Sequence, residues 1–166
     1  MNWRIEANDV LSRVDGLSPW IFTGCLYLVR WIVVVPIGYA VCQLGGSNNA
    51  ATFTGSPMSL LLGFIFLAPL SETLIECAVP YWLMSKAGRN RLGERPWAFV
   101  VVSALLMALL HVGAWPSAIL PSLVTGSFLA YTYGHFATSG TGWAILHTCV
   151  FHAGINMVGW LLLVAF

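Results

Sequence analysis

Four polar residues that could together hydrolyse a peptide bond lie within otherwise apolar stretches of the sequence: Glu72, His111, His152 and Asn156. A carboxylate with an imidazole can orient and deprotonate a water molecule, and can then pass the proton to a leaving amine. A second imidazole and a side-chain amide can donate hydrogen bonds to the oxyanion that develops. These four residues could fill those roles without a metal.

The same side chains also allow a metal-dependent mechanism. His111, His152 and Glu72 could hold one divalent metal such as zinc and leave a position open for water. The sequence does not separate the two mechanisms, so the cofactor is left open between one divalent metal and none.

Other chemistries lack the residues that they need. No aspartate follows Asp15 and no GxSxG motif occurs, so a serine–histidine–aspartate triad is not available. No glycine-rich phosphate-binding motif occurs either, which argues against nucleotide binding. The 7 basic and 6 acidic residues nearly cancel, so we expect no basic surface for nucleic acid.

Helical spacing relates these residues to their neighbours. Glu72 and Glu76 are four residues apart, or about 40° around an α-helix, so Glu76 is expected to face the same way as an accessory carboxylate. His152 and Asn156 have the same spacing. His147 is expected to face elsewhere, as a packed histidine hydrogen-bonded to a neighbouring helix. Arg30 is expected either to snorkel or to pair with a carboxylate.

The composition indicates that a membrane surrounds these residues. The chain has 166 residues, of which 58% are hydrophobic and 8% are charged, whereas a soluble domain is about 25% charged. We predict an all-α, multi-pass transmembrane bundle of five spans, since a spanning helix needs about 20 apolar residues. Residues 1–19 form an N-terminal segment, and residues 20–166 form one domain with spans at about 20–43, 58–84, 97–115, 117–133 and 142–166.

The basic residues set the predicted orientation. Lys86, Arg89, Arg91 and Arg95 lie between the second and third spans and make up four of the 7 basic residues. The positive-inside rule therefore places the 85–96 loop, and with it the N-terminus, in the cytoplasm. Measured from the cytoplasmic ends of their predicted spans, Glu72, His111, His152 and Asn156 all lie roughly 15–21 Å deep. This common depth predicts one shared site near the middle of the bilayer.

Three short motifs resemble those of the CPBP family, the type II CAAX prenyl endopeptidases and bacteriocin-processing (Abi) proteins. The stretch from Ala68 to Glu76, APLSETLIE, resembles the first family motif, AP-x-x-EE-x-x-x-R. The stretch MALLH, ending at His111, is similar to the second motif, F-x-x-x-H, and HAGIN, from His152 to Asn156, matches the third, H-x-x-x-N. Thr73, Cys77 and Met107 depart from the residues that are usual at those positions.

The resemblance covers about residues 60–160 and implies an intramembrane endopeptidase. It implies that Glu72 and His111 activate water and that His152 and Asn156 stabilise the oxyanion. The expected partners are a peptide or protein substrate at the membrane, prenylated or bacteriocin-like, and the lipid bilayer itself. Two other hypotheses remain open: a non-catalytic immunity or scaffold protein of the same fold, and a small transporter, which the absence of an inverted repeat disfavours.

Overall fold

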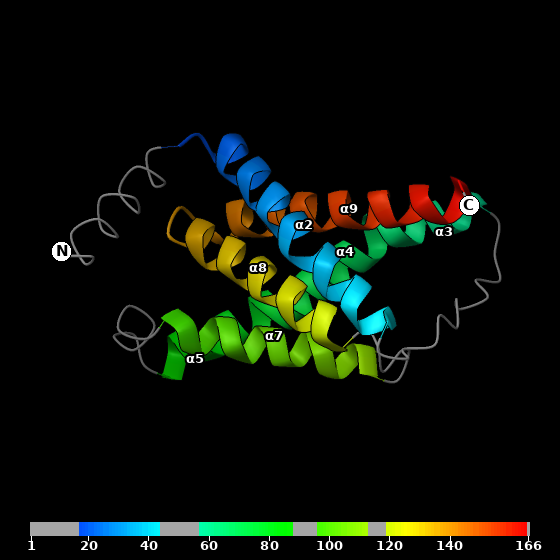
Figure 1. Ribbon diagram of the computed structural model, residues 1–166. Helices are drawn as coiled ribbons and strands as arrows, with labels where there is room; N and C mark the ends of the chain where they lie inside the picture. Colours follow the sequence, from blue (N-terminus) through cyan, green and yellow to red (C-terminus); the bar gives the residue numbers. More distant parts are fainter. Residues whose placement is uncertain (1–16, 44–56, 88–95, 113–118, 166) are drawn as a thin grey trace.

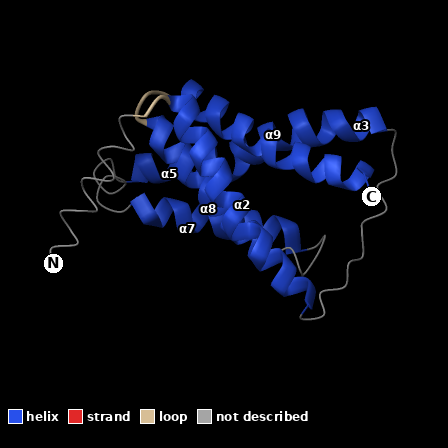
Figure 2. Ribbon diagram, turned by 45° about the horizontal axis from the view of Figure 1, so that its top comes forward, coloured by secondary structure: helices blue, strands red, loops and turns tan. Residues whose placement is uncertain are grey.

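The structure is a computed structural model that describes residues 17–43, 57–87, 96–112 and 119–165. Every regular element within these ranges is helical, and none of these residues belongs to a strand (Figure 2). The predicted all-α class is therefore confirmed.

The helices follow the predicted apolar stretches closely. The first is α2 (Pro19–Gln43), and the last three are α7 (Pro96–Val112), α8 (Ile119–Ala137) and α9 (Thr141–Ala165). Between them, an unbroken helical run consists of α3 (Pro57–Leu62), η1 (Gly63–Leu67), α4 (Ala68–Glu72), η2 (Thr73–Ala78) and α5 (Val79–Ala87). The fourth helix continues to Ala137 instead of ending near residue 133. The predicted end of the third span lies outside the described residues.

Three of these helical stretches are long and apolar enough to span a membrane: Pro19–Val41, Gly63–Lys86 and Thr141–Leu161. The helix Trp97–His111 is apolar but shorter. Large apolar side chains remain exposed on the bundle, among them Ile32 and Leu109, which are 72% and 68% exposed. Such a surface suggests membrane association. Whether all five helices cross the bilayer stays a prediction.

Packing brings the five helices around one interior. Helix α8 lies between α7 and α9, while α2 crosses obliquely over α8 and α9 (Figure 1). The buried core contains large aromatic side chains from several helices, including Phe22, Tyr133 and Phe151. The second helical run packs through η1, α4 and η2 against α9. Glu72 at the end of α4 thereby faces the helix that carries His152 and Asn156.

Two prolines account for the π-helical segments in the second run. The N–H of Ala68 donates to Gly63 O and that of Val79 donates to Leu74 O, so both bonds reach back five residues instead of four. Pro69 and Pro80 directly follow these donors. A proline has no N–H and its ring crowds the carbonyl four residues back, which disrupts the α-helical pairing. The helix therefore changes its register at both places.

Helices α7 and α8 approach each other closely at Gly126. A Cβ atom added there would lie 2.8 Å from Met107 Cβ and 3.0 Å from Ala104 Cα. Small residues allow such backbone approach between membrane helices. We expect Gly126→Ala to destabilise the protein by about 1–3 kcal/mol, as overpacked cores do, which a thermal unfolding measurement in detergent would detect. Gly24→Ala is the matched control, because nothing lies within 4 Å of its added Cβ. Equal melting temperatures for the two variants would refute this close packing.

Candidate active site

A cavity of about 280 Å³ lies between α2, the second helical run, α7, α8 and α9. All four residues that the sequence singled out line it. Its described lining comprises Arg30, Phe64, Ala68, Glu72, Met107, His111, Pro121, Ser122, Thr125, His152, Ile155 and Asn156. Residues more than 80 positions apart in the sequence therefore share one chamber, as their common depth predicted. Their catalytic roles stay predictions.

Glu72 and His152 form a direct contact across the cavity. His152 Nε2 lies 3.3 Å from Glu72 Oε2. The imidazole side chain is only 3% exposed, whereas the Glu72 side chain is 24% exposed. An ionised carboxylate only accepts hydrogen bonds, so His152 Nε2 carries the proton in this contact. The histidine thus orients the carboxylate, whose other oxygen is free of this bond.

His111 is fixed through the opposite ring nitrogen. Its Nδ1 lies 2.7 Å from the carbonyl oxygen of Met107, one turn earlier on α7. A carbonyl can only accept, so Nδ1 donates, and Nε2 of the neutral ring carries a lone pair. The ring is close enough to interact electrostatically with both Glu72 and His152. His111 can therefore accept a proton or a hydrogen bond beside Glu72.

Asn156 donates a hydrogen bond to a carbonyl in η1 that the π-helical register leaves without a backbone N–H. Its Nδ2 donates to Phe64 O at 2.9 Å. In the π-helical register of η1, Phe64 O would receive the N–H of the residue five positions later, but that residue is Pro69 and has none. The amide of Asn156 supplies a donor in its place. Pro69 of the first motif therefore helps to position Asn156 of the third.

Glu76 does not share the cavity with Glu72. It is 1% exposed, and neither oxygen of its carboxylate has a hydrogen-bond partner among the described residues. Because a π-helical turn takes more residues than an α-helical one, the segment η2 alters the angle between the two glutamates. Glu76 is not among the described residues that line the cavity, and its role as an accessory carboxylate stays a prediction. The two carboxylates remain near enough to interact electrostatically.

Arg30 lines the cavity, although the sequence analysis predicted that it would snorkel or pair with a carboxylate. It neither snorkels nor pairs with a described carboxylate, because it is 6% exposed and lines the cavity instead. Its Nη2 donates to Thr125 Oγ1 at 3.1 Å, and its Cζ lies 4.4 Å from the centre of the Trp31 ring. The relevant signal was the depth of Arg30 near the middle of its predicted span, where a charge usually faces the bundle interior.

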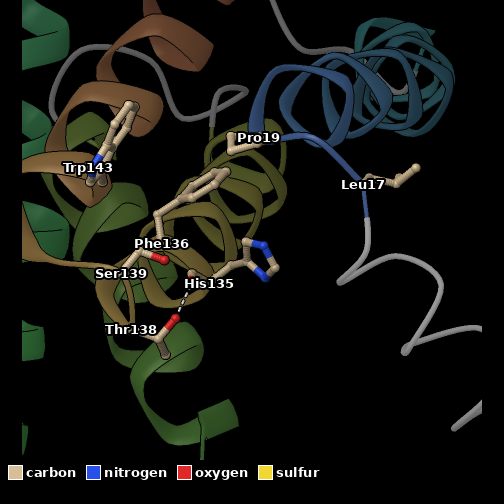
Figure 3. Close-up of a pocket in the computed structure, with 7 residues that line it drawn as sticks. All are labelled: Leu17, Pro19, His135, Phe136, Thr138, Ser139 and Trp143. Atoms are coloured by element: carbon tan, nitrogen blue, oxygen red, sulfur yellow. Dashed lines mark hydrogen bonds between the residues drawn. The ribbon is translucent and has the colours of Figure 1, made fainter.

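His147 lies apart from this site, as expected. Its Nδ1 lies 3.1 Å from Thr23 Oγ1 of α2, and its ring stacks on Phe136. A second and larger cavity of about 650 Å³ lies nearby, where the start of α2 meets the turn between α8 and α9 (Figure 3). Among its described lining residues, His135 is the one ionisable side chain. None of the four residues predicted from the sequence is among the described lining residues of this larger cavity.

The predicted metal ligands do not fit a metal site as they stand. Among the described parts of the chain, no group of three or more His, Cys, Asp or Glu side chains is arranged to hold a metal ion. Glu72 and His152 bond to each other, and His111 is anchored separately to a backbone carbonyl. The described residues therefore do not support a catalytic step through a metal.

Comparisons with known proteins return no match. No protein-family model, curated protein or solved structure matches the chain.

Proposed function

We propose that the protein is a multi-pass intramembrane endopeptidase that hydrolyses a peptide bond of a membrane-associated substrate. The observation that carries the proposal is the contact between Glu72 and His152 in one chamber with His111 and Asn156. A structural role would require no such convergence of a carboxylate, two imidazoles and an amide at one point of an apolar bundle. The three CPBP-like motifs support the same activity and favour a prenylated or bacteriocin-like substrate.

We infer a role for each side chain from this geometry. The oxygen of Glu72 that does not contact His152 accepts one hydrogen of a water molecule, and His111 Nε2 accepts the other. As the water oxygen bonds to the carbonyl carbon, its proton passes to Glu72. When the carbon–nitrogen bond breaks, Glu72 returns this proton to the leaving amine. His152 keeps the carboxylate oriented throughout, and Asn156 offers its remaining N–H to the chamber.

The proposal is tested by the peptides that the purified protein releases. The protein in liposomes should generate new peptide ends from a membrane-fraction peptide mixture, identified by mass spectrometry, and a chelator should not abolish them. New ends at the same rate with empty liposomes would reject the activity. A scaffold or immunity protein would release none.

The proposed orientation places the 85–96 loop and the N-terminus in the cytoplasm. Most of this loop lies outside the described residues, so the prediction rests on its basic residues. A cysteine substituted for Arg91, in a variant without the native cysteines, should resist an impermeant thiol reagent added to intact cells. It should react after the cells are opened. Labelling of intact cells would reverse the orientation.

A further inference from the structure

The guanidinium of Arg30 has hydrogen-bonding capacity that the described part of the chain does not use. Its Nε and Nη1 are buried and have no hydrogen-bond partner in the described structure. These two nitrogens carry more than half of the N–H donors of the group. The side chain is 94% buried by its 6% exposure and lines the same chamber as Glu72. The chamber therefore contains a fixed cation with free donors.

Such an arrangement is costly unless something binds to it. A buried charge without hydrogen bonds is unfavourable, and charged side chains inside membrane bundles usually mark functional sites. The contacts that Arg30 does make, with Thr125 Oγ1 and the Trp31 ring, hold the guanidinium in place without neutralising it. Thr125 and Trp31 thus position the Arg30 guanidinium where it can bind an anion.

The other candidate donors of the chamber are partly committed elsewhere. His152 Nε2 is engaged with Glu72, and Asn156 Nδ2 uses one hydrogen on Phe64 O. His111 presents a lone pair at Nε2, so its neutral ring has no donor to offer there. Apart from one N–H of Asn156 and the hydroxyls of Ser122 and Thr125, the oxygen of a scissile carbonyl that enters the chamber would therefore meet Arg30 as its donor, and Arg30 is the one cationic donor among the described lining residues.

We propose that Arg30 is the anion-binding residue of this chamber and that, during hydrolysis, it stabilises the oxyanion of the tetrahedral intermediate. This inference rests on the proposed peptidase function. When the water oxygen bonds to the carbonyl carbon, the electron pair of the carbonyl π-bond moves to its oxygen, which the guanidinium N–H groups then hold. The pair returns as the carbon–nitrogen bond breaks and Glu72 delivers the proton to the amine. A donor present before the reaction stabilises the transition state more than the neutral substrate.

The test compares Arg30→Met, which keeps much of the apolar length, with Arg30→Lys, which keeps the charge. Removal of one oxyanion donor typically costs about 10²–10³-fold in kcat, so we expect Arg30→Met to lose kcat on this scale with KM little changed. Arg30→Lys should recover part of the loss. Lys86→Met is the matched control, because its ammonium also lies over an indole ring, 4.2 Å from the centre of Trp82, but outside the cavity lining. It should behave as wild type.

A binding measurement keeps the inference separate from the peptidase proposal. The probe is a peptidyl phosphonate, whose anionic tetrahedral phosphorus mimics the intermediate, compared with the neutral carboxamide of the same sequence. Wild type and Lys86→Met should bind the phosphonate more tightly, and Arg30→Met should lose that preference. An unchanged preference in Arg30→Met would overturn the inference, as would equal kcat in wild type and Arg30→Met. If wild type cleaves nothing, the peptidase proposal and the oxyanion role fail together, and the phosphonate preference still decides whether Arg30 binds an anion.

Discussion

Replacement of Glu72 by glutamine is expected to reduce the rate of peptide cleavage by about 10²–10⁴-fold, the usual loss for a general base. Glutamine nearly keeps the shape of the side chain and can still hydrogen-bond to His152, but it cannot take a proton from water. The initial rate of cleavage by purified protein in liposomes, corrected for the folded fraction, measures the effect.

Glu76→Gln provides the matched control for this loss. It makes the same chemical change one helical turn away, in a carboxylate that does not line the chamber. We expect this variant to keep most of the wild-type rate. The reverse order of activities would identify Glu76 as the base, and wild-type rates in both variants would reject the mechanism.

Replacement of His111 by glutamine is expected to have the second large effect. Glutamine has an amide oxygen that can accept a hydrogen bond, but it lacks the basic Nε2 and the ring that Met107 O anchors, so a loss of about 10²-fold or more is expected in kcat. His147→Gln is the control, because His147 bonds to Thr23 and packs on Phe136 away from the chamber.

The two histidine variants are compared by kcat per folded protein. His147→Gln disturbs a buried contact and can lower the melting temperature, but the folded molecules should cleave at nearly the wild-type rate. If His147→Gln were inactive and His111→Gln active, the proposed site would contain the wrong histidine.

Most of the fold follows from apolar stretches of sequence that only lipid or a protein interior can cover. The start of α2 at Pro19 and of α9 at Thr141 lie within one residue of their predicted positions, because hydropathy changes sharply there. The end of α8 was placed too early, because Gly134 and His135 suggested a loop, whereas the helix continues to Ala137. A glycine that packs against Phe99 does not break a helix held by its neighbours.

The depth of residues in the predicted spans was enough to predict which of them share a cavity. The orientation of single side chains depends on local helix geometry and could not be predicted in this way. Glu72, His111 and His152 lie at similar distances from the cytoplasmic ends of their predicted spans, which predicted that they would meet, and all three line one chamber. The π-helical register beside Glu76 could not be predicted from a 3.6-residue period, and neither could its absence from the described cavity lining. The depth of Arg30 within its predicted span indicated an interior position, but its hydrogen bond to Thr125 depended on how α2 packs over α8.

The most direct test of the central claim is cleavage of one identified peptide in H₂¹⁸O by wild-type protein and by Glu72→Gln, purified side by side. If water activated by Glu72 attacks the peptide bond, the new C-terminal carboxylate released by wild type will carry ¹⁸O. The glutamine variant will release little product over the same time. Equal amounts of labelled product from both preparations would contradict the account, because hydrolysis would then not depend on the carboxylate that His152 holds in the chamber.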